Sequence, residues 1–289
     1  MRGDISGRRR ESPGCTVEKP GSGATAIEKR DEGMYTAGID VGSITAKAAV
    51  FKDGAVLGTK VIFTGYSAGD AGRRVFEELL GELGLDVSSV SRIVSTGYGR
   101  NSVTFASKAM TEIICHGAGA HFLNPHVRSV IDVGGQDSKV IILNGEGRVS
   151  DFAMNDKCAA GTGRFLEVMA RALEVDLADF GELSLVSDEP SRISSICTVF
   201  AESEVISLIS KGEMRKNIIA GIHDAVAARI AALAKRTGIR PPVMMTGGVA
   251  RNIGVVKALE RKLELPIEVL ESAQTNGAIG AAVIAARHG

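Results

Sequence analysis

Apolar-rich runs and turn residues predict the elements at the start of the folded part of the chain. Runs over residues 35–40, 46–51 and 56–63 predict three strands, and Asp53-Gly54 predicts a hairpin turn between the second and the third. A helix is predicted over residues 69–83, and a short strand over residues 91–95. The order is therefore strand, hairpin, helix and strand.

The second half of the chain is mostly helical. Helix-spaced apolar residues predict helices over residues 159–173, 198–210, 214–235, 252–263 and 277–287. A short buried strand is predicted over residues 243–246, and it leads directly into Gly247-Gly248. Strands mixed with helices in this way predict an α/β fold.

The opening pattern of the chain returns about ninety residues later. Residues 39–42 read Ile-Asp-Val-Gly, and residues 131–134 read Ile-Asp-Val-Gly again. In the same register Lys47 corresponds to Lys139, and Asn144-Gly145 offers turn chemistry near where Asp53-Gly54 does. We therefore predict two related lobes, with the second hairpin starting near residue 130. Chance is the alternative, because short glycine-containing matches also arise at random.

The first 33 residues differ from the rest of the chain. They are rich in Gly, Ser, Arg and Glu, and they show no hydrophobic period. We predict a disordered N-terminal extension over residues 1–33 and a folded region over residues 34–289, so that a protein starting at Met34 should fold. A transit peptide is the alternative for the extension.

Charge and composition narrow the class of protein. Lys+Arg and Asp+Glu balance at 34 each, which argues against a nucleic-acid surface as the main function. No apolar run approaches membrane-spanning length, and no secretory signal is recognisable, so we predict a cytoplasmic protein with no membrane partner. In a reducing cytoplasm the four Cys are not expected to form disulfides.

The Gly-rich turns are candidate phosphate-binding elements. The chain has no P-loop motif and no Gly-x-Gly-x-x-Gly motif after a strand. Instead, Gly42-Ser43 and Gly134-Gly135 can turn backbone N–H groups toward an anion. Two such turns facing each other would hold a polyphosphate from both sides.

Side chains beside these turns suggest a magnesium–nucleotide site. Asp40 and Asp132 each end a strand, where a carboxylate can face Mg²⁺ and position the attacking water. Gln136 and Asp137 lie beside the second turn and can help to orient that water. Lys47 and Lys139 either touch phosphate or are strand residues at the lobe surface.

Two of the four cysteines are candidate metal ligands. Cys158 and Cys197 each precede a predicted helix, whose N-terminus favours a thiolate and a negatively charged cluster. Neither belongs to a C-x-x-C pair, and two ligands are half of the set that a cubane cluster needs. A twofold dimer could supply the other half; the alternative is that both are buried and inert. Cys15 and Cys115 are interpreted as structural.

Longer motifs give a family resemblance that spans nearly the whole chain from Met34. The two hairpins, with Met-Thr-Gly-Gly-Val-Ala-Arg-Asn at residues 245–252, resemble the superfamily of acetate and sugar kinases, chaperone ATPases and actin. That resemblance implies two ribonuclease-H-like lobes with ATP in the cleft between them and the adenosine against Gly247 and Gly248. A Gly247→Val substitution is then expected to block the nucleotide without unfolding the chain.

The segments around Cys158 and Cys197, with Gly-Gly-Gln-Asp at residues 134–137, resemble the activator (component A) of 2-hydroxyacyl-CoA dehydratases in the BadF/BadG/BcrA/BcrD ATPase family. The resemblance implies an oxygen-sensitive homodimer with one 4Fe-4S cluster, shared between the subunits and ligated by Cys158 and Cys197. It implies that ATP hydrolysis drives a low-potential electron from ferredoxin or flavodoxin into the dehydratase. An ATP-binding subunit of a benzoyl-CoA reductase is the alternative; a small-molecule kinase and a regulatory ATPase are further ones.

Overall fold

A computed structural model of the chain describes Met1, residues 34–194 and residues 197–287. The disordered extension predicted for residues 1–33, and Cys15 within it, lie outside the described residues. The chain divides into two units, Met1–Glu32 and Gly33–Gly289, and the description below concerns the second unit alone.

The first sheet has five strands in the order β3-β2-β1-β4-β5. Strands β1 (Tyr35–Val41), β2 (Thr45–Lys52) and β3 (Ala55–Phe63) form an antiparallel meander. Asp53 and Gly54 have φ angles of 50° and 81°, as the predicted hairpin turn requires. Strands β4 (Val90–Thr96) and β5 (Lys108–Ala109) extend the sheet in parallel with β1.

The second sheet repeats this design, with five strands in the order β10-β9-β6-β7-β8. Strands β6 (Ser129–Val133), β7 (Ser138–Leu143) and β8 (Val149–Asn155) form the antiparallel meander. Strands β9 (Val243–Thr246) and β10 (Ile267–Glu268) run parallel to β6. In both sheets the first strand of the meander is therefore central, which confirms two related α/β lobes.

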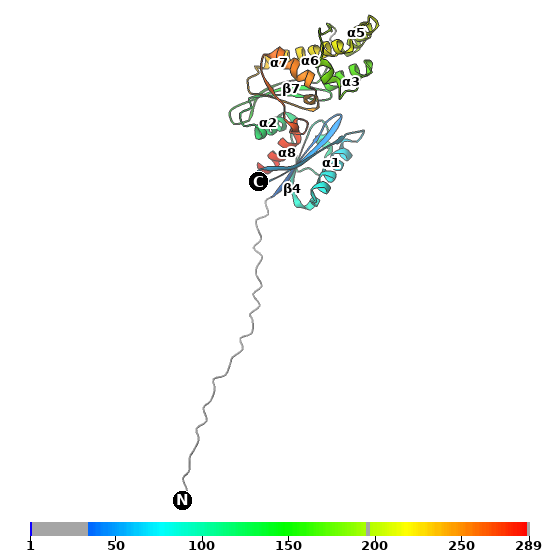
Figure 1. The fold of residues 1–289 in the computed structure, drawn as a ribbon. Coiled ribbons are helices and arrows are strands. Elements are labelled where there is room, and N and C mark those ends of the chain that lie inside the picture. Colours follow the sequence, from blue (N-terminus) through cyan, green and yellow to red (C-terminus); the bar gives the residue numbers. More distant parts are fainter. Residues whose placement is uncertain (2–33, 195–196, 288–289) are drawn as a thin grey trace. The chain divides into compact units, whose positions relative to one another are not determined.

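Helices cover both faces of each sheet. Helix α1 (Ala68–Leu83) packs on one face of the first sheet, and the C-terminal helix α8 (Asn276–Arg287) packs on the other. Helix α2 (Glu112–Leu123) packs against the second sheet, whose opposite face carries α6 (Arg215–Thr237). Helices α2 and α8 pack against each other and join the two lobes (Figure 1).

Small residues allow α2 and α8 to approach closely. A Cβ atom on Gly280 would lie 1.8 Å from the carbonyl oxygen of Cys115, and one on Gly119 would lie 2.3 Å from that of Asn276. Neither glycine could therefore carry a side chain in this packing. The close packing of a small-residue helix around a buried Cys115, expected from the sequence, is confirmed.

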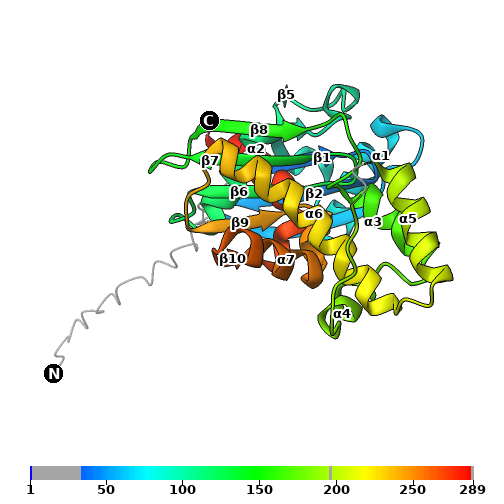
Figure 2. The ribbon, with the colours of Figure 1, turned by 90° about the horizontal axis from the view of Figure 1, so that it is seen from above.

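The remaining helices belong to the second lobe. They are α3 (Gly163–Ala172), α4 (Phe180–Leu185), α5 (Thr198–Ser210) and α7 (Ile253–Leu263). Figure 2 shows α6 running across the second sheet, with α3, α4 and α5 gathered at one end of it. Helix α6 is long and apolar enough to cross a membrane, but 67% of its apolar window is buried in this fold, as in the core helix of a soluble protein.

Most predicted elements are confirmed within one or two residues, but one boundary is wrong. The helix predicted from residue 159 begins at Gly163, because residues 159–162 form a turn that leaves Thr162 as the N-cap. The turn predicted at Asn144-Gly145 is present after β7, and its left-handed φ of 73° lies at Gly147. Asn144 accepts hydrogen bonds from the amides of Glu146 and Arg148 there, which organises a longer loop. Helix α4 and strand β8 were not predicted.

Candidate nucleotide site between the lobes

The two repeated hairpins place an Asp–Lys pair in the same position of each lobe. Asp40 on β1 is the register partner of Lys47 on β2, and Asp132 on β6 is the register partner of Lys139 on β7. The side chains form ion pairs of 3.2 Å in the first hairpin and 3.3 Å in the second. Paired residues on neighbouring strands project to the same face, so the repeat in the sequence becomes a repeated charge pair at the cleft.

The turns that close these hairpins also match. The amide of Gly42 donates to the carbonyl of Thr45 at 3.0 Å, and the amide of Gly134 donates to the carbonyl of Asp137 at 3.0 Å. The turns approach each other, since a Cβ atom on Gly135 would lie 2.4 Å from Cδ1 of Ile44. The geometry therefore has two glycine turns that face each other, as a polyphosphate site needs.

A cavity of about 440 Å³ lies between the turns, a volume within the range of small-molecule and cofactor sites. Nine residues expected at the site line it: Asp40, Gly42, Ser43, Asp132, Gly134, Gly135, Asp137, Gly247 and Gly248. Gln136 is exposed and is not among the lining residues, so its role in orienting water remains a prediction. Leu166, Leu177 and Val249 add apolar surface for a base or a sugar.

Gly247 and Gly248 differ in whether the surrounding structure leaves room for a side chain. Gly247 has a φ of 87°, and a Cβ atom there would lie 2.3 Å from the carbonyl oxygen of Val133 on β6. A Gly247→Val substitution would therefore disturb the β6–β9 junction, contrary to the expectation that it would leave the fold intact. A Cβ atom on Gly248 would meet nothing within 4 Å, so Gly248 is the position where a side chain can enter the cavity.

Lys139 is the centre of a buried charge cluster. It is 1% exposed, which excludes a place at the lobe surface. Its Nζ lies 2.7 Å from Asp137, 3.3 Å from Asp132 and 3.6 Å from Glu112. Burial disfavours the charged ammonium, but the three carboxylates outweigh that effect and raise the pKa of Lys139. Lys47 lines the cavity as Lys139 does, but among the described residues its one carboxylate partner is Asp40.

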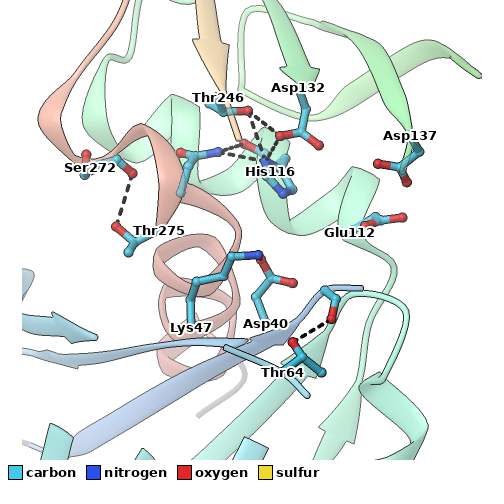
Figure 3. A network of polar contacts seen from close by, with 12 residues as sticks. Asp40, Lys47, Thr64, Glu112, His116, Asp132, Asp137, Thr246, Ser272 and Thr275 are labelled. Carbon is cyan, nitrogen blue, oxygen red and sulfur yellow. Dashed lines mark hydrogen bonds and ion pairs between the residues drawn. The ribbon is translucent and has the colours of Figure 1, made fainter. Parts of the chain in front are cut away.

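Asp132 is held as a carboxylate by its neighbours (Figure 3). Burial alone would raise its pKa, but His116, Lys139 and the hydroxyl of Thr246 lower it to about 2. The Thr246 hydroxyl donates to Oδ1 at 3.0 Å, and Nδ1 of His116 lies 3.3 Å from the same oxygen. The second phosphate hairpin is thereby tied to β9 and to α2.

Tyr98, Glu112 and His116 are among the cavity residues that were not predicted from the sequence. Glu112 and His116 come from the first two turns of α2, and Tyr98 comes from the loop after β4. Burial, together with the charge and a hydrogen bond of Asp137, raises the pKa of Tyr98 to about 12. No local motif marks Glu112, and the spacing of the His residues at 116, 121 and 126 does not fit one helix face.

Cys158 and Cys197 both carry free, exposed thiols on the second lobe. Cys197 is the N-cap of α5, as predicted, and makes no side-chain capping hydrogen bond. Cys158 does not head a helix, because it lies five residues before α3. Asn155 holds its turn: the Asn155 amide donates to the Cys158 carbonyl at 2.8 Å and its Oδ1 accepts from the Cys158 amide at 3.3 Å.

The segment that follows Cys158 is hydrogen-bonded to the second phosphate turn. The amides of Gly163 and Arg164 donate to the carbonyls of Gly134 and Gly135 at 2.9 Å and 2.8 Å. Within the described part of the chain no three His, Cys, Asp or Glu side chains gather as a metal site. Two accessible thiols do fit the donor chemistry of an iron–sulfur cluster, as half of a ligand set.

Two facing glycine turns, paired carboxylates and a nucleotide-sized cavity between ribonuclease-H-like lobes define an actin-like ATPase fold. The chain belongs to the BadF/BadG/BcrA/BcrD ATPase family, whose model matches residues 37–285. The family resemblance seen in the sequence is thereby confirmed.

Characterised relatives cover almost all of the matched region. The chain is 46% identical over 254 residues to the 2-hydroxyisocaproyl-CoA dehydratase activator of Clostridioides difficile, covering 87% of this chain and 95% of that protein. It is 35% identical over 262 residues to one of the subunits of benzoyl-CoA reductase from Thauera aromatica, covering 86% of this chain and 92% of that protein. The similarity to the dehydratase activator is thus greater.

Two solved structures of dehydratase activators are similar to this chain. Component A of (R)-2-hydroxyglutaryl-CoA dehydratase from Acidaminococcus fermentans superposes with a TM-score of 0.86 at 48% identity, covering 88% of this chain and 98% of that one. The activator of 2-hydroxyisocaproyl-CoA dehydratase from Clostridium difficile with bound ADPNP gives 0.84 at 45% identity, covering 88% and 95%.

Proposed function

We propose that this protein is an ATP-dependent activator that delivers a low-potential electron to a 2-hydroxyacyl-CoA dehydratase. The observation that carries the proposal is the backbone link between a nucleotide-sized cavity and an exposed cysteine. The turn at Gly134-Gly135 lines the cavity, and it accepts hydrogen bonds from the segment that begins at Cys158. An ATPase site and a redox site joined by backbone hydrogen bonds are what such an activator requires.

ATP would bind with its phosphates between the two glycine turns. The N–H groups of Ser43 and Gly135 are suited to this role, in turns that the amides of Gly42 and Gly134 close by bonding to Thr45 and Asp137. Asp40 and Asp132 are suited to Mg²⁺ and its water ligands. Asp137 lies beside them, and Gln136 has the side chain to orient water once the cleft closes. The adenosine would lie against Gly247-Gly248, where the lining is more apolar.

Gly248→Val tests the nucleotide site without disturbing the fold, because its side chain would occupy open cavity space. We expect ATP affinity to fall about 100-fold, equivalent to about 2.7 kcal/mol, with an unchanged melting temperature. Gly145→Val, in a turn where the glycine also has nothing within 4 Å, is the matched control. Unchanged ATP binding by Gly248→Val, measured by calorimetry, would place the nucleotide elsewhere.

A 4Fe-4S cluster would be held by Cys158 and Cys197 of two copies of the chain. When bound, such a cluster supplies one-electron chemistry at low potential. The surface around Cys197 favours a protein interface, since Val199, Phe200 and Ile206 on α5 are 65%, 66% and 55% exposed. Cys158 and Cys197 would provide the thiols, and a hydrogen bond from Asn155 holds the turn that carries Cys158.

Iron content distinguishes this assignment from inert thiols. Anaerobically purified Cys158→Ser and Cys197→Ser should each lose nearly all of the iron, about four per dimer in the parent protein. Cys115→Ala, at a buried thiol away from this surface, and Cys15→Ala should keep it. Air should bleach the parent protein. Full iron retention in Cys158→Ser would reject the shared site.

Nucleotide state would reach the cluster through the second phosphate turn. A shift of Gly134 and Gly135 on ATP binding displaces the hydrogen-bonded start of α3, and α3 packs on α5, the helix that Cys197 caps. ATP must favour one lobe arrangement for this coupling to act. We expect an iron chelator to remove iron at different rates from the ADP and ATP-analogue states. Equal rates of iron removal in the two nucleotide states would contradict the proposed coupling between the nucleotide site and the cluster.

The partners follow from the same proposal: a second copy of the chain, a ferredoxin or flavodoxin as donor, and the dehydratase as acceptor in a reducing cytoplasm. The alternative is a cluster-bearing subunit of a benzoyl-CoA reductase. Light scattering on the purified protein separates the two. An activator forms a homodimer by itself, whereas a reductase subunit needs a different partner chain.

A further inference from the structure

Glu112 is a cavity carboxylate that lies outside both of the repeated hairpins. It lies in the first turn of α2, the helix between the two lobes, and its side chain is 19% exposed. It lines the same cavity as both glycine turns. In Figure 3 it lies between the Asp40–Lys47 pair and the group formed by Asp132 and Asp137. Glu112 is therefore beside the space that phosphates would occupy.

The other cavity carboxylates near the turns have close cationic partners. Asp40 pairs with Lys47 at 3.2 Å. Asp137 pairs with Lys139 at 2.7 Å, and Asp132 pairs with the same ammonium and with His116, both at 3.3 Å. These contacts favour the binding of an ammonium or a cation, and at Asp132 they lower the pKa to about 2, which disfavours taking a proton from water.

Glu112 has a different balance of charges. Among the residues that the structure describes, its one ion-pair partner is Lys139, at 3.6 Å, the longest of the contacts of that ammonium. Burial raises the pKa of Glu112, Lys139 and His116 act against this, and the negative charges of Asp137 and Asp132 add to it. A carboxylate with a raised proton affinity, open to the cavity, is the usual form of a general base.

We propose that Glu112 accepts the proton from the water that attacks the γ-phosphorus of ATP. This inference rests on the proposed ATPase function and adds a residue to it. The water oxygen forms a bond to phosphorus, the bond from phosphorus to the β–γ bridging oxygen breaks, and ADP leaves with that electron pair. The water proton passes to Glu112 and then to the released phosphate or to solvent, so no further reactant is needed.

Lys139 is then a positioning residue for this step. Its ammonium bridges Glu112 and Asp137, which come from α2 and from the second phosphate turn. The bridge fixes the Glu112 carboxylate relative to the turn that would hold the γ-phosphate. Because Lys139 is buried, its ammonium is held in place, and the Glu112 carboxylate is positioned relative to it.

Glu112→Gln keeps the size of the side chain and removes its basicity. We expect the steady-state rate of ATP hydrolysis to fall by about 10²–10⁴-fold, with the affinity for a non-hydrolysable ATP analogue unchanged within about threefold. Glu182→Gln is the matched control, because Glu182 also lies in the first turn of a helix but is exposed and outside the cavity. It should hydrolyse ATP like the parent protein.

The pH dependence of ATP hydrolysis distinguishes a general base at Glu112 from a Glu112 side chain with only a structural role. Hydrolysis by the parent protein should decline as acidification protonates Glu112, and the residual rate of Glu112→Gln should lack this acidic limb. Glu112→Asp, which keeps the charge one methylene further away, should be at least tenfold slower with the limb retained; it also decides the matter if the Gln variant does not fold.

Parent-like hydrolysis by Glu112→Gln or Glu112→Asp would overturn the assignment. Loss of analogue binding together with activity in Glu112→Gln would also overturn it, because Glu112 would then be a binding residue. Failure of the parent protein itself to hydrolyse ATP would instead reject the proposed function.

Discussion

The two phosphate hairpins have the same backbone and different electrostatics. In both, an Asp at the end of the first strand faces a Lys on the second, at 3.2 Å and 3.3 Å. Among the described residues Lys47 has one carboxylate partner, whereas Lys139 is buried among three. The repeated backbone is therefore the same in both lobes, but the carboxylates around the two ammonium groups differ. Lys139 is the centre of a buried charge cluster, and Lys47 is not.

The largest contrast is expected from removing each lysine in turn. Lys139→Met leaves Asp132, Asp137 and Glu112 close together without their cation, so the free energy of unfolding should fall by about 3–5 kcal/mol. Lys47→Met leaves one carboxylate open to the cavity and should cost about 1–3 kcal/mol, while weakening ATP binding. Urea denaturation followed by circular dichroism measures both, since the chain has no Trp. Equal losses would mean that the hairpins are electrostatically equivalent.

A smaller effect is expected in the pH dependence of stability. The folded-state pKa of Asp132, lowered to about 2 from its usual value of 3.8, means that its carboxylate stabilises the fold above about pH 4. That contribution, about 2 kcal/mol, is lost as the pH falls toward 2. Asp132→Asn should therefore be less stable at neutral pH and should lose less stability on acidification.

Asp151→Asn, at an exposed carboxylate on β8, is the control for this titration and should follow the parent protein. Denaturation midpoints between pH 2 and pH 6 give the comparison. A parallel pH dependence in Asp132→Asn and the parent would show that the buried carboxylate has no special role.

The smallest effect concerns the link between the two hairpins. Tyr98 lies on a loop tied to the first hairpin, since the Gly99 amide donates to the Val41 carbonyl at 2.9 Å, and its phenol interacts with Asp137 of the second. Tyr98→Phe should release ADP several-fold faster while changing the free energy of unfolding by about 1 kcal/mol or less. Stopped-flow displacement of a fluorescent nucleotide measures the release rate.

Absorbance titration gives an independent readout of the same contact. Of the three Tyr in the chain, Tyr98 has its pKa raised to about 12, so the last phenol to ionise should be missing in Tyr98→Phe. Tyr66→Phe, at a fully exposed ring, should keep that step. Loss of that ionisation step in Tyr66→Phe would contradict the assignment of the raised pKa to Tyr98.

Local pattern was enough for the elements and for the hairpins. Strands, turns and helices depend on neighbouring residues, so the turn at Asp53-Gly54 could be recognised in the sequence. The repeat of Ile-Asp-Val-Gly located both glycine turns before any tertiary contact was known. The start of α3 was misplaced because Ala159 and Ala160 favour a helix, whereas residues 159–162 form a turn after Cys158.

The sequence by itself determined two related α/β lobes, the two Asp-headed glycine turns, the Gly-Gly element and the two cysteines that mark the family. Only the tertiary structure decided which charges meet. Glu112 joins Lys139 because α2 packs on the second sheet, and Gly247 differs from Gly248 because β6 lies beside only one of them. Such properties depend on burial and on contacts between distant segments, and a local pattern of residues contains neither.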